Sequence, residues 1–403
     1  MNRHSDLEAL REGQVLESVA LTRDEAAALN STDLVTVQPG ADGWRVTAAH
    51  TVGAIRCGDL VIRVRPKIGA LQVLRLLARA HGVAGLKVDE LLIGVAEDPD
   101  ITAVLALLFA EEASTAMAAG PMRGYRTEEQ TLSVLRGRLR LRDQELRRFG
   151  RLVPLEVTVD EWTTDTDENR RIRAACRRLL LFADAPQSTR DRLAHLDRLL
   201  ADVWLVPRGA LLAPWTPSRL NTRLHRLLHL ADLVLDQATV EHRVGTVEVH
   251  GFVLSMAWLF ERLIQQLLTE ASGMVRVMAQ HPRPLDIQAR LTIKPDLEFT
   301  DGARVVAVAD TKYKLLDEQG KFPNADAYQL VTYCARLGLK VGHLIYAAGE
   351  PRPEPFDIDG AEIRLIIHSV DLQQPVANLE SQVETLFDNI VTATEQQSSH
   401  WRS

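Results

Sequence analysis

Two acids and a lysine lie in a segment whose other residues favour paired β-strands. In IKPDLEFTDGARVVAVADTKYK, residues 293–314, Asp296 lies on the first predicted strand, and Asp310 and Lys312 lie near the end of the next one. Strands favour β-branched and aromatic residues and disfavour Asp and Lys, so these three residues call for a chemical explanation. Residues two apart on a strand point to the same face, so Asp310 and Lys312 share one.

Together these residue types predict metal-assisted hydrolysis of a phosphodiester. Two carboxylates that converge from neighbouring strands repel each other unless a cation lies between them. Carboxylate oxygens are the ligands that Mg²⁺ and Mn²⁺ prefer, so Asp296 and Asp310 are predicted metal ligands for Mg²⁺ (or Mn²⁺). A lysine on the same face can orient a water molecule or stabilise charge that develops on a phosphate, which makes Lys312 a predicted catalytic residue.

The spacing imposes a geometric condition on this hypothesis. If Asp301 and Gly302 formed a two-residue hairpin turn, Asp296 would face position 307, and Asp310 would emerge on the opposite side of the sheet. The hypothesis therefore requires a loop of odd length or one β-bulge, and Gly302 suits a left-handed turn position.

Pro-Asp, a short strand, a turn and a hydrophobic strand that ends in Asp-x-Lys resemble the PD-(D/E)xK nuclease superfamily. That resemblance adds Glu261, in WLFERLIQQLL, as a third metal-binding and catalytic carboxylate from the first helix, and Thr311 as a metal ligand. It also adds a Q-x-x-x-Y element on one helical face, with Gln329 as a catalytic residue and Tyr333 as a DNA contact.

Each of these residues also has an ordinary structural interpretation. Glu261 fits a helix-surface acid, Gln329 and Tyr333 fit helix packing, and Lys314 fits a solvated lysine as well as a phosphate contact. Glu298 has the parity of Asp296 and is a reserve ligand.

A cluster of positive charge precedes this region by more than a hundred residues. Between Arg123 and Arg151 there are nine arginines against four acids, although the chain as a whole has a net charge of −7. In LRGRLRLR, arginine alternates with leucine, which predicts a strand with one basic and one apolar face. The arginines on that face are expected to contact DNA or a partner protein, or to form a solvated surface; they are Arg136, Arg138, Arg140 and Arg142.

The elements that must position these residues predict a multidomain chain of the α/β and α+β classes. Residues 1–66 contain short V/I/T-rich runs separated by turns, typical of antiparallel strands. Residues from about 164 to 240 favour helices. From 241 onward the order of helix, three strands, helix and strand predicts a mixed sheet flanked by helices.

Composition restricts the class of protein. A chain of 403 residues with 46% hydrophobic and 25% charged residues is expected to form a globular protein of two or three domains. No apolar run has the ~18 residues of a membrane helix. The N-terminal segment lacks the apolar stretch of a secretory signal, and three scattered cysteines predict a reducing, cytoplasmic compartment.

The order of motifs from about residue 55 to 335 resembles the McrC family, the nuclease subunits of McrBC modification-dependent restriction systems. This resemblance implies a partner, a McrB-like hexameric AAA+ GTPase ring, and a substrate, double-stranded DNA with modified cytosine. It implies that the N-terminal region docks on the ring and stimulates GTP hydrolysis. The expected domains are a β-rich docking domain over 1–160, a helical connector over 161–240 and a PD-(D/E)xK endonuclease domain over 241–403.

Two other functions remain open from the sequence. One is a regulatory subunit that activates the partner GTPase without cutting DNA. The other is a stand-alone repair or recombination nuclease. The chain contains no G-x-x-x-x-G-K-[ST] loop, so any P-loop motor must belong to another chain.

Overall fold

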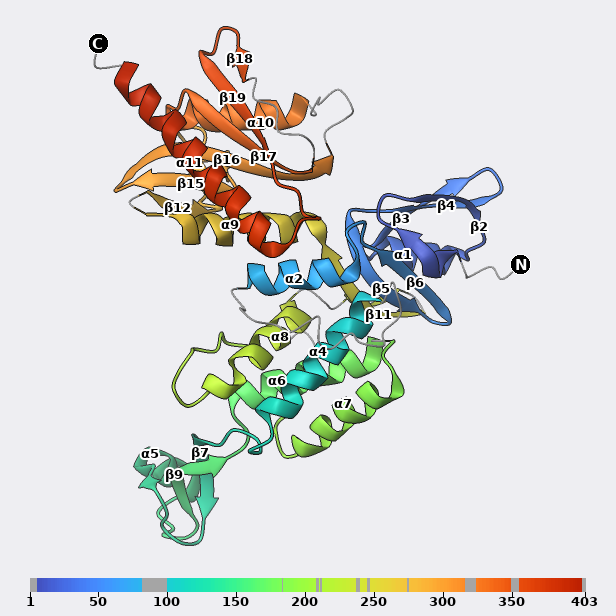
Figure 1. Cartoon of the computed structure of the whole chain (residues 1–403). Coiled ribbons are helices and arrows are strands. Elements are labelled where there is room, and N and C mark those ends of the chain that lie inside the picture. The colour runs from blue at the N-terminus through green and yellow to red at the C-terminus, as the bar shows by residue number, and fades with distance from the viewer. Residues whose placement is uncertain are drawn as a thin grey trace. The chain divides into compact units, whose positions relative to one another are not determined.

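The computed structural model gives a mixed α/β chain, as predicted (Figure 1). It divides into two compact units. The first comprises Met1–Ile101, His242–Glu248 and Val253–Ser403, and the second comprises Thr102–Glu241 and Val249–Phe252. The structure describes residues 6–81, 100–182, 184–207, 210, 212–236, 240–244, 247–273, 275–315, 324–348 and 355–400.

The N-terminal part of the first unit consists of short strands, as the turn-rich sequence predicted. One three-stranded antiparallel sheet has β4 (Gly43–Ala48) between β2 (Val15–Val19) and β3 (Val35–Gly40), and α1 (Arg23–Asn30) packs beside it. In a second sheet, β6 (Leu60–Arg65) pairs with β1 (Leu10–Arg11) and β5 (Thr51–Cys57). The strands β10 (Val240–Val244) and β11 (Val247–Ser255) are each divided between the two units.

The C-terminal part of the first unit is built on a six-stranded mixed sheet with the order β12-β15-β16-β17-β19-β18. Neighbouring strands are antiparallel from β12 to β16, parallel from β16 to β19, and antiparallel between β18 and β19. The strands are β12 (Arg276–Ala279), β15 (Leu297–Asp301), β16 (Arg304–Leu315), β17 (Val341–Ala348), β18 (Phe356–Ile358) and β19 (Ile363–Ser369). This arrangement confirms the predicted mixed sheet.

Helices from both ends of the chain pack around this sheet. The helices α9 (Met256–Ala271) and α11 (Val376–His400) contact each other and β16, whereas α10 (Asn324–Leu337) packs on β17. The N-terminal helix α2 (Ala70–Ala80) packs on α9, and its Arg79 Nε lies 2.5 Å from Glu380 Oε1. Two ends of the sequence thus form one compact unit.

The second unit combines helices with a small sheet. The helix α6 packs on α7 and α8, and β9 lies between β7 and β8. The elements are α4 (Ile101–Ala116), β7 (Gly124–Leu132), β8 (Arg138–Leu139), α5 (Leu141–Arg148), β9 (Leu155–Thr163), α6 (Asp167–Phe182), α7 (Gln187–Leu199) and α8 (His225–Asp236). By contacts, the long segment of the second unit runs from Thr102 to Glu241, and the expected docking, connector and nuclease domains stay predictions. In the part of the chain that the structure describes, no helix has the length and apolarity of a membrane span.

The prediction of a basic strand over residues 136–142 is wrong. Only Arg138 and Leu139 are in a strand, and α5 begins at Leu141. Gly137 has a positive φ of 76°, and a Cβ there would lie 2.2 Å from the Thr158 carbonyl oxygen, so the chain turns sharply before β8. The leucines do not form a buried apolar face either, because Leu135 is 59% and Leu141 65% exposed.

The close approach of α10 to β17 gives a test of this packing. A Cβ at Gly342 would lie 2.7 Å from Cys334 Sγ and 2.8 Å from Leu330 Cγ, both on α10. We expect Gly342→Ala to lower the free energy of unfolding by about 1–3 kcal/mol, the usual cost of overpacking a core. Denaturant titration measures this loss. Gly273→Ala is the matched control, because a Cβ at Gly273 meets open space; equal stability of the two variants would contradict the packing.

Candidate active site

The register of β15 and β16 brings Asp296 and Asp310 together. Asp301 pairs with Arg304 and Thr300 with Val305, but after one register shift Phe299 pairs with Ala307 and Leu297 with Ala309. One step further along this register, Asp296 lies beside Asp310. The structure therefore contains the bulge that the sequence required, and Gly302 adopts the expected left-handed conformation with φ 59°.

The three central residues are held by short contacts. Asp296 Oδ2 accepts hydrogen bonds from the Thr311 backbone N–H at 2.8 Å and from the Thr311 hydroxyl at 2.9 Å. Lys312 Nζ lies 2.5 Å from Asp310 Oδ2. The Asp310 side chain is only 1% exposed, and neither of its oxygens accepts a well-oriented hydrogen bond from the described residues. Lys312 is thus the close counter-charge of a buried carboxylate.

Burial and neighbouring charges shift the pKa values of Asp310 and Lys312. Burial, followed by the nearby Asp296 carboxylate, raises the pKa of Asp310 to about 7, and Lys312 only partly opposes this rise. Burial alone would lower the pKa of Lys312, but the Asp310 and Asp296 carboxylates raise it. The ammonium group is therefore firmly charged, whereas Asp310 ionises with difficulty.

Glu261 of α9 lies within electrostatic reach of the same acids. Burial, and then the charge of Asp296, raises the pKa of Glu261, and Gln280 Nε2 donates a hydrogen bond to its carboxylate. Among the described residues, no three His, Cys, Asp or Glu side chains already converge at metal-binding distance. The structure thus brings Glu261 to the neighbourhood of the pair without closing a three-carboxylate site.

The Q-x-x-x-Y pair of α10 reaches the lysine. Gln329 Oε1 accepts a hydrogen bond from Lys312 Nζ at 3.1 Å, and Gln329 Nε2 donates to the Tyr333 hydroxyl at 2.6 Å. The Tyr333 hydroxyl donates a hydrogen bond to the Lys294 carbonyl oxygen at 3.4 Å. A connected chain of polar groups therefore runs from the backbone before Asp296 to the ammonium of Lys312.

Two further predicted residues have partners of their own. Lys314 Nζ lies 3.2 Å from Asp326 Oδ1, so this lysine pairs with α10. Glu298 is fully buried, and Arg283 binds both of its oxygens at 2.7 and 2.8 Å. Its charge is thus already matched by the guanidinium, which makes it a poor reserve ligand.

Sequence reasoning missed Asp326, a buried acid in the first turn of α10. Besides Lys314, it accepts a hydrogen bond from the Tyr346 hydroxyl at 3.0 Å, and its charge acts on Lys312. Its only sequence signal was an acid beside an alanine-rich helix start, which is common at helix N-termini. The predicted arginines lie in the second unit: Arg136 pairs with Glu161 at 3.3 Å, and Arg140 pairs with Glu129 and Asp143.

The residues at the centre fit a divalent cation. Asp310 is buried, Lys312 only partly offsets its charge, and the Asp296 carboxylate raises its pKa, so a positive charge between the two acids would relieve the costs of burial and of like charge. The carboxylate atoms that could bind a metal ion are oxygens, the ligand type that Mg²⁺ and Mn²⁺ prefer.

Comparisons with known proteins identify the family. A sequence model described as "McrBC 5-methylcytosine restriction system component" matches residues 46–347. The chain belongs to this family. A search of curated proteins finds no match.

Among solved structures, this McrBC-family chain is similar to a chain in the refined half-complex from a tetradecameric assembly of Thermococcus gammatolerans McrB AAA+ hexamers with bound McrC. The two chains are 20% identical over 94% of this chain and 99% of that one, with a TM-score of 0.62. A chain of the Thermococcus gammatolerans McrBC complex is 21% identical over 65% of this chain and 87% of that one, with a TM-score of 0.44. At this identity the first likeness shows a shared fold.

The raised pKa of Asp310 predicts how stability depends on pH. An unfolded Asp has a pKa near 3.9, so between about pH 4 and pH 7 the folded chain keeps a proton that the unfolded chain releases, and stability falls as the pH rises through this window. In EDTA, we expect Asp310→Asn to be more stable than the unmodified chain at pH 8, by a few kcal/mol, with the difference shrinking towards pH 4. Unfolding titrations across this range measure the effect. Asp301→Asn, an exposed acid of the same hairpin, should leave the pH profile unchanged; identical profiles for Asp310→Asn and the unmodified chain would contradict the buried, repelled carboxylate.

Proposed function

We propose that this chain is the metal-dependent DNA endonuclease subunit of a McrBC-like type IV restriction complex, with a PD-(D/E)xK catalytic centre. The observation that supports it most is the meeting of Asp296, Asp310 and Lys312 at one point of the mixed sheet, with Lys312 Nζ 2.5 Å from Asp310 Oδ2. Membership of the McrBC 5-methylcytosine restriction family supports a substrate of double-stranded DNA with modified cytosine.

The residues that would hold Mg²⁺ or Mn²⁺ are Asp296, Asp310, Thr311 and Glu261. When bound, the cation supplies Lewis-acid activation of a water molecule and neutralises charge on the scissile phosphate. Thr311 holds Asp296 in place through two hydrogen bonds, so this carboxylate keeps its orientation. Preorganised ligands of this kind bind a cation without paying for rearrangement during the reaction.

Besides the cation, Lys312 supplies a positive charge at the site from the protein itself. Two groups restrain its ammonium, Asp310 on one side and the Gln329 amide oxygen on the other, and Gln329 is itself fixed by Tyr333. An ammonium held in this way can orient the attacking water or stabilise a phosphate oxygen in the transition state. Gln329 and Tyr333 therefore act through Lys312 in this proposal, and Lys314 lies on the same strand as a further candidate contact to phosphate.

The second unit is proposed to bind a McrB-like AAA+ GTPase ring and to stimulate it. The related structure described above contains McrB AAA+ hexamers with bound McrC, and this sequence has no P-loop of its own. The small sheet, α5 and the loops between them expose nine large apolar side chains: Tyr125, Val134, Leu135, Leu141, Leu146, Phe149, Leu152, Val153 and Trp162. Exposed apolar side chains favour contact with a partner protein when they are contiguous, and their number here supports the proposal.

Cleavage by the reconstituted system tests the nuclease. With a McrB-like partner, GTP, Mg²⁺ and methylated DNA, we expect the unmodified chain to cut the DNA. Asp310→Ala should lower the cleavage rate at least about a thousandfold, because several kcal/mol of cation-dependent stabilisation are lost, and should leave GTPase stimulation intact. Asp301→Ala is the control, since this acid is exposed on the same hairpin.

The outcomes also separate the alternative functions. GTPase stimulation by the unmodified chain without any cutting would favour a regulatory subunit. Cutting by the chain alone, without partner or GTP, would favour a stand-alone nuclease. Undiminished cutting by Asp310→Ala would refute the proposed centre.

Charge reversal on the second unit tests the partner surface. Arg138 and Arg142 are exposed, and neither forms an ion pair within the described residues, whereas Arg136 and Arg140 already have acidic partners. We expect Arg138→Glu with Arg142→Glu to slow association with the GTPase ring about tenfold at low salt, because rim charges act mainly on association rates. Stopped-flow binding and GTPase assays measure this.

Arg190→Glu with Arg198→Glu is the matched control. These two arginines are exposed on α7 of the same unit and form no ion pair in the described part of the chain. If both double variants behave like the unmodified chain, the arginines near β8 are solvated surface and the partner binds elsewhere.

A further inference from the structure

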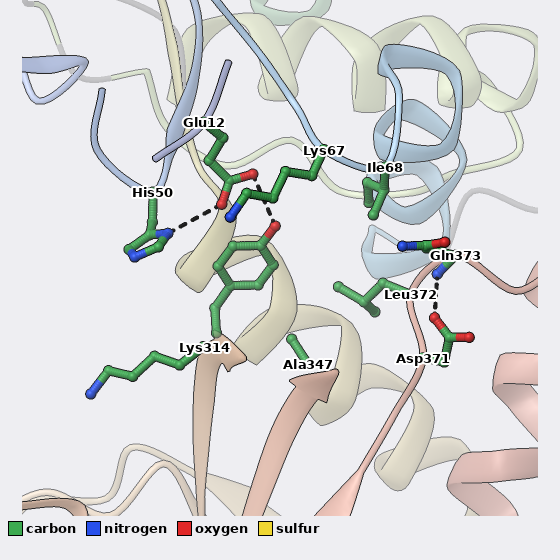
Figure 2. Close-up of a pocket in the computed structure, with 10 residues that line it drawn as sticks. Glu12, His50, Lys67, Ile68, Lys314, Ala347, Asp371, Leu372 and Gln373 are labelled. Atoms are coloured by element: carbon green, nitrogen blue, oxygen red, sulfur yellow. Dashed lines mark hydrogen bonds and ion pairs between the residues drawn. The ribbon is translucent and has the colours of Figure 1, made fainter. Parts of the chain in front are cut away.

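Glu12 is a buried carboxylate far from the candidate acids in sequence, yet it contacts the strand that carries them. It lies between β1 and β2, and its residue is 3% exposed. The Tyr313 hydroxyl donates a hydrogen bond to Glu12 Oε2 at 3.1 Å, and His50 Nδ1 lies 3.2 Å from Glu12 Oε1. The dashed lines from Glu12 in Figure 2 mark these two contacts. Both carboxylate oxygens are thus used.

Tyr313 follows Lys312 directly and touches the helix that carries Glu261. Its ring centroid lies 6.5 Å from that of Phe260 on α9, the residue before Glu261. On its other side it makes an edge contact of 6.0 Å with the His50 ring. The tyrosine therefore lies between the N-terminal strands and α9, while the neighbouring Lys312 contacts Asp310.

The same cluster holds the start of α9. The Met256 backbone N–H donates a hydrogen bond to the His50 carbonyl oxygen at 3.1 Å, and α9 begins at Met256. The Glu12 backbone N–H in turn donates to the Arg65 carbonyl at 3.0 Å, at the end of β6. One group of residues in the N-terminal strands thus contacts both elements of the candidate site, the end of β16 and the first turn of α9.

Packing alone does not fix the tyrosine. A cavity of ≈ 350 Å³ lies beside it, and its lining includes Glu12, Lys67, Ile68 and Leu372. Figure 2 shows these side chains around the open space. A side chain next to a cavity lacks contacts on that side, so its position depends more heavily on its directional hydrogen bond.

We propose that Glu12 is a positioning residue for the candidate active site. Its carboxylate ties Tyr313 and His50 to the N-terminal strands, and so sets the separation between β16, with Asp310 and Lys312, and α9, with Glu261. The effect on cation binding rests on the proposed function, whereas the effect on the two elements themselves does not. The N-terminal part of the chain thus has a role in positioning a site more than two hundred residues away in sequence.

Mn²⁺ binding to the full chain, measured by calorimetry, tests the link to the site. We expect Glu12→Ala and Tyr313→Phe to weaken Mn²⁺ binding by about tenfold, as the loss of groups that orient metal ligands does. The double variant should be no weaker than Glu12→Ala, because both changes remove one interaction. Glu12→Gln, which keeps an acceptor for the tyrosine, should recover most of the affinity. At saturating Mn²⁺ the cleavage rate of Glu12→Ala should return close to that of the unmodified chain.

Glu17→Ala is the matched control, since it removes an exposed acid of β2 that pairs with Arg45. If Glu12→Ala and Tyr313→Phe lower the melting temperature but leave the Mn²⁺ affinity unchanged, Glu12 is merely structural and the proposal is overturned. Tyr313→Phe removes only a hydroxyl, so it keeps the test decisive if Glu12→Ala fails to fold.

Hydrogen exchange separates this proposal from the proposed function. If Asp310→Ala binds Mn²⁺ as tightly as the unmodified chain, the proposed metal centre fails, and exchange in metal-free protein then decides the role of Glu12. We expect amides at the start of α9 and near Tyr313 to exchange faster in Glu12→Ala than in Glu17→Ala. Equal exchange in the two variants would overturn the positioning role.

Discussion

One additional residue in β16 determines where the two acids lie. The hairpin between β15 and β16 has a tight turn, and without the shift between Phe299 and Thr300 its register would place Asp296 and Asp310 on opposite faces. Because side chains in a strand alternate, a shift of one residue moves an entire set of side chains to the other face. The bulge therefore converts two acids of separate strands into neighbours, and the contacts of Thr311, Lys312 and Gln329 all depend on it. Bulges commonly redirect side chains near active sites in this way.

The cost of this arrangement is electrostatic. Asp310 is buried beside a second carboxylate, and only Lys312 among the described residues lies close enough to balance it. With Glu261 nearby, the group of three acids and one lysine has an excess of negative charge in a poorly solvated place. Elsewhere in the same sheet the chain avoids this cost, since Arg283 binds the buried Glu298 through two hydrogen bonds. Glu298 of β15 is thus neutralised, whereas Asp296, just before this strand, and Asp310 of β16 are not fully neutralised. This contrast is typical of a site that is completed by a ligand.

The sequence predicted local patterns well and distant contacts poorly. The mixed sheet, the shared face of Asp310 and Lys312, and the pairing of Gln329 with Tyr333 follow from periodicity over a few residues, and the structure contains all three. The alternation of arginine with leucine predicted a strand, but the chain turns at Gly137. The Thr158 backbone that crowds this glycine is far away in sequence, so the local pattern could not reveal the turn. The partners of Glu298, Asp326 and Glu12 could not be predicted for the same reason.

The division of the chain into two units restricts how binding at one could affect chemistry at the other. The second unit contains the exposed apolar side chains and includes Val249–Phe252, the middle of β11. Four residues after Phe252 the chain enters α9, whose first N–H bonds to His50 and whose second turn carries Glu261. The covalent route from the second unit to the acids therefore runs directly through α9. Within the first unit, the Met256 N–H at the start of α9 bonds to the His50 carbonyl, and Tyr313 of β16 bonds to Glu12, so both elements are hydrogen-bonded to the N-terminal part of the chain. The helix α9 itself carries Glu261, the third acid of the candidate site.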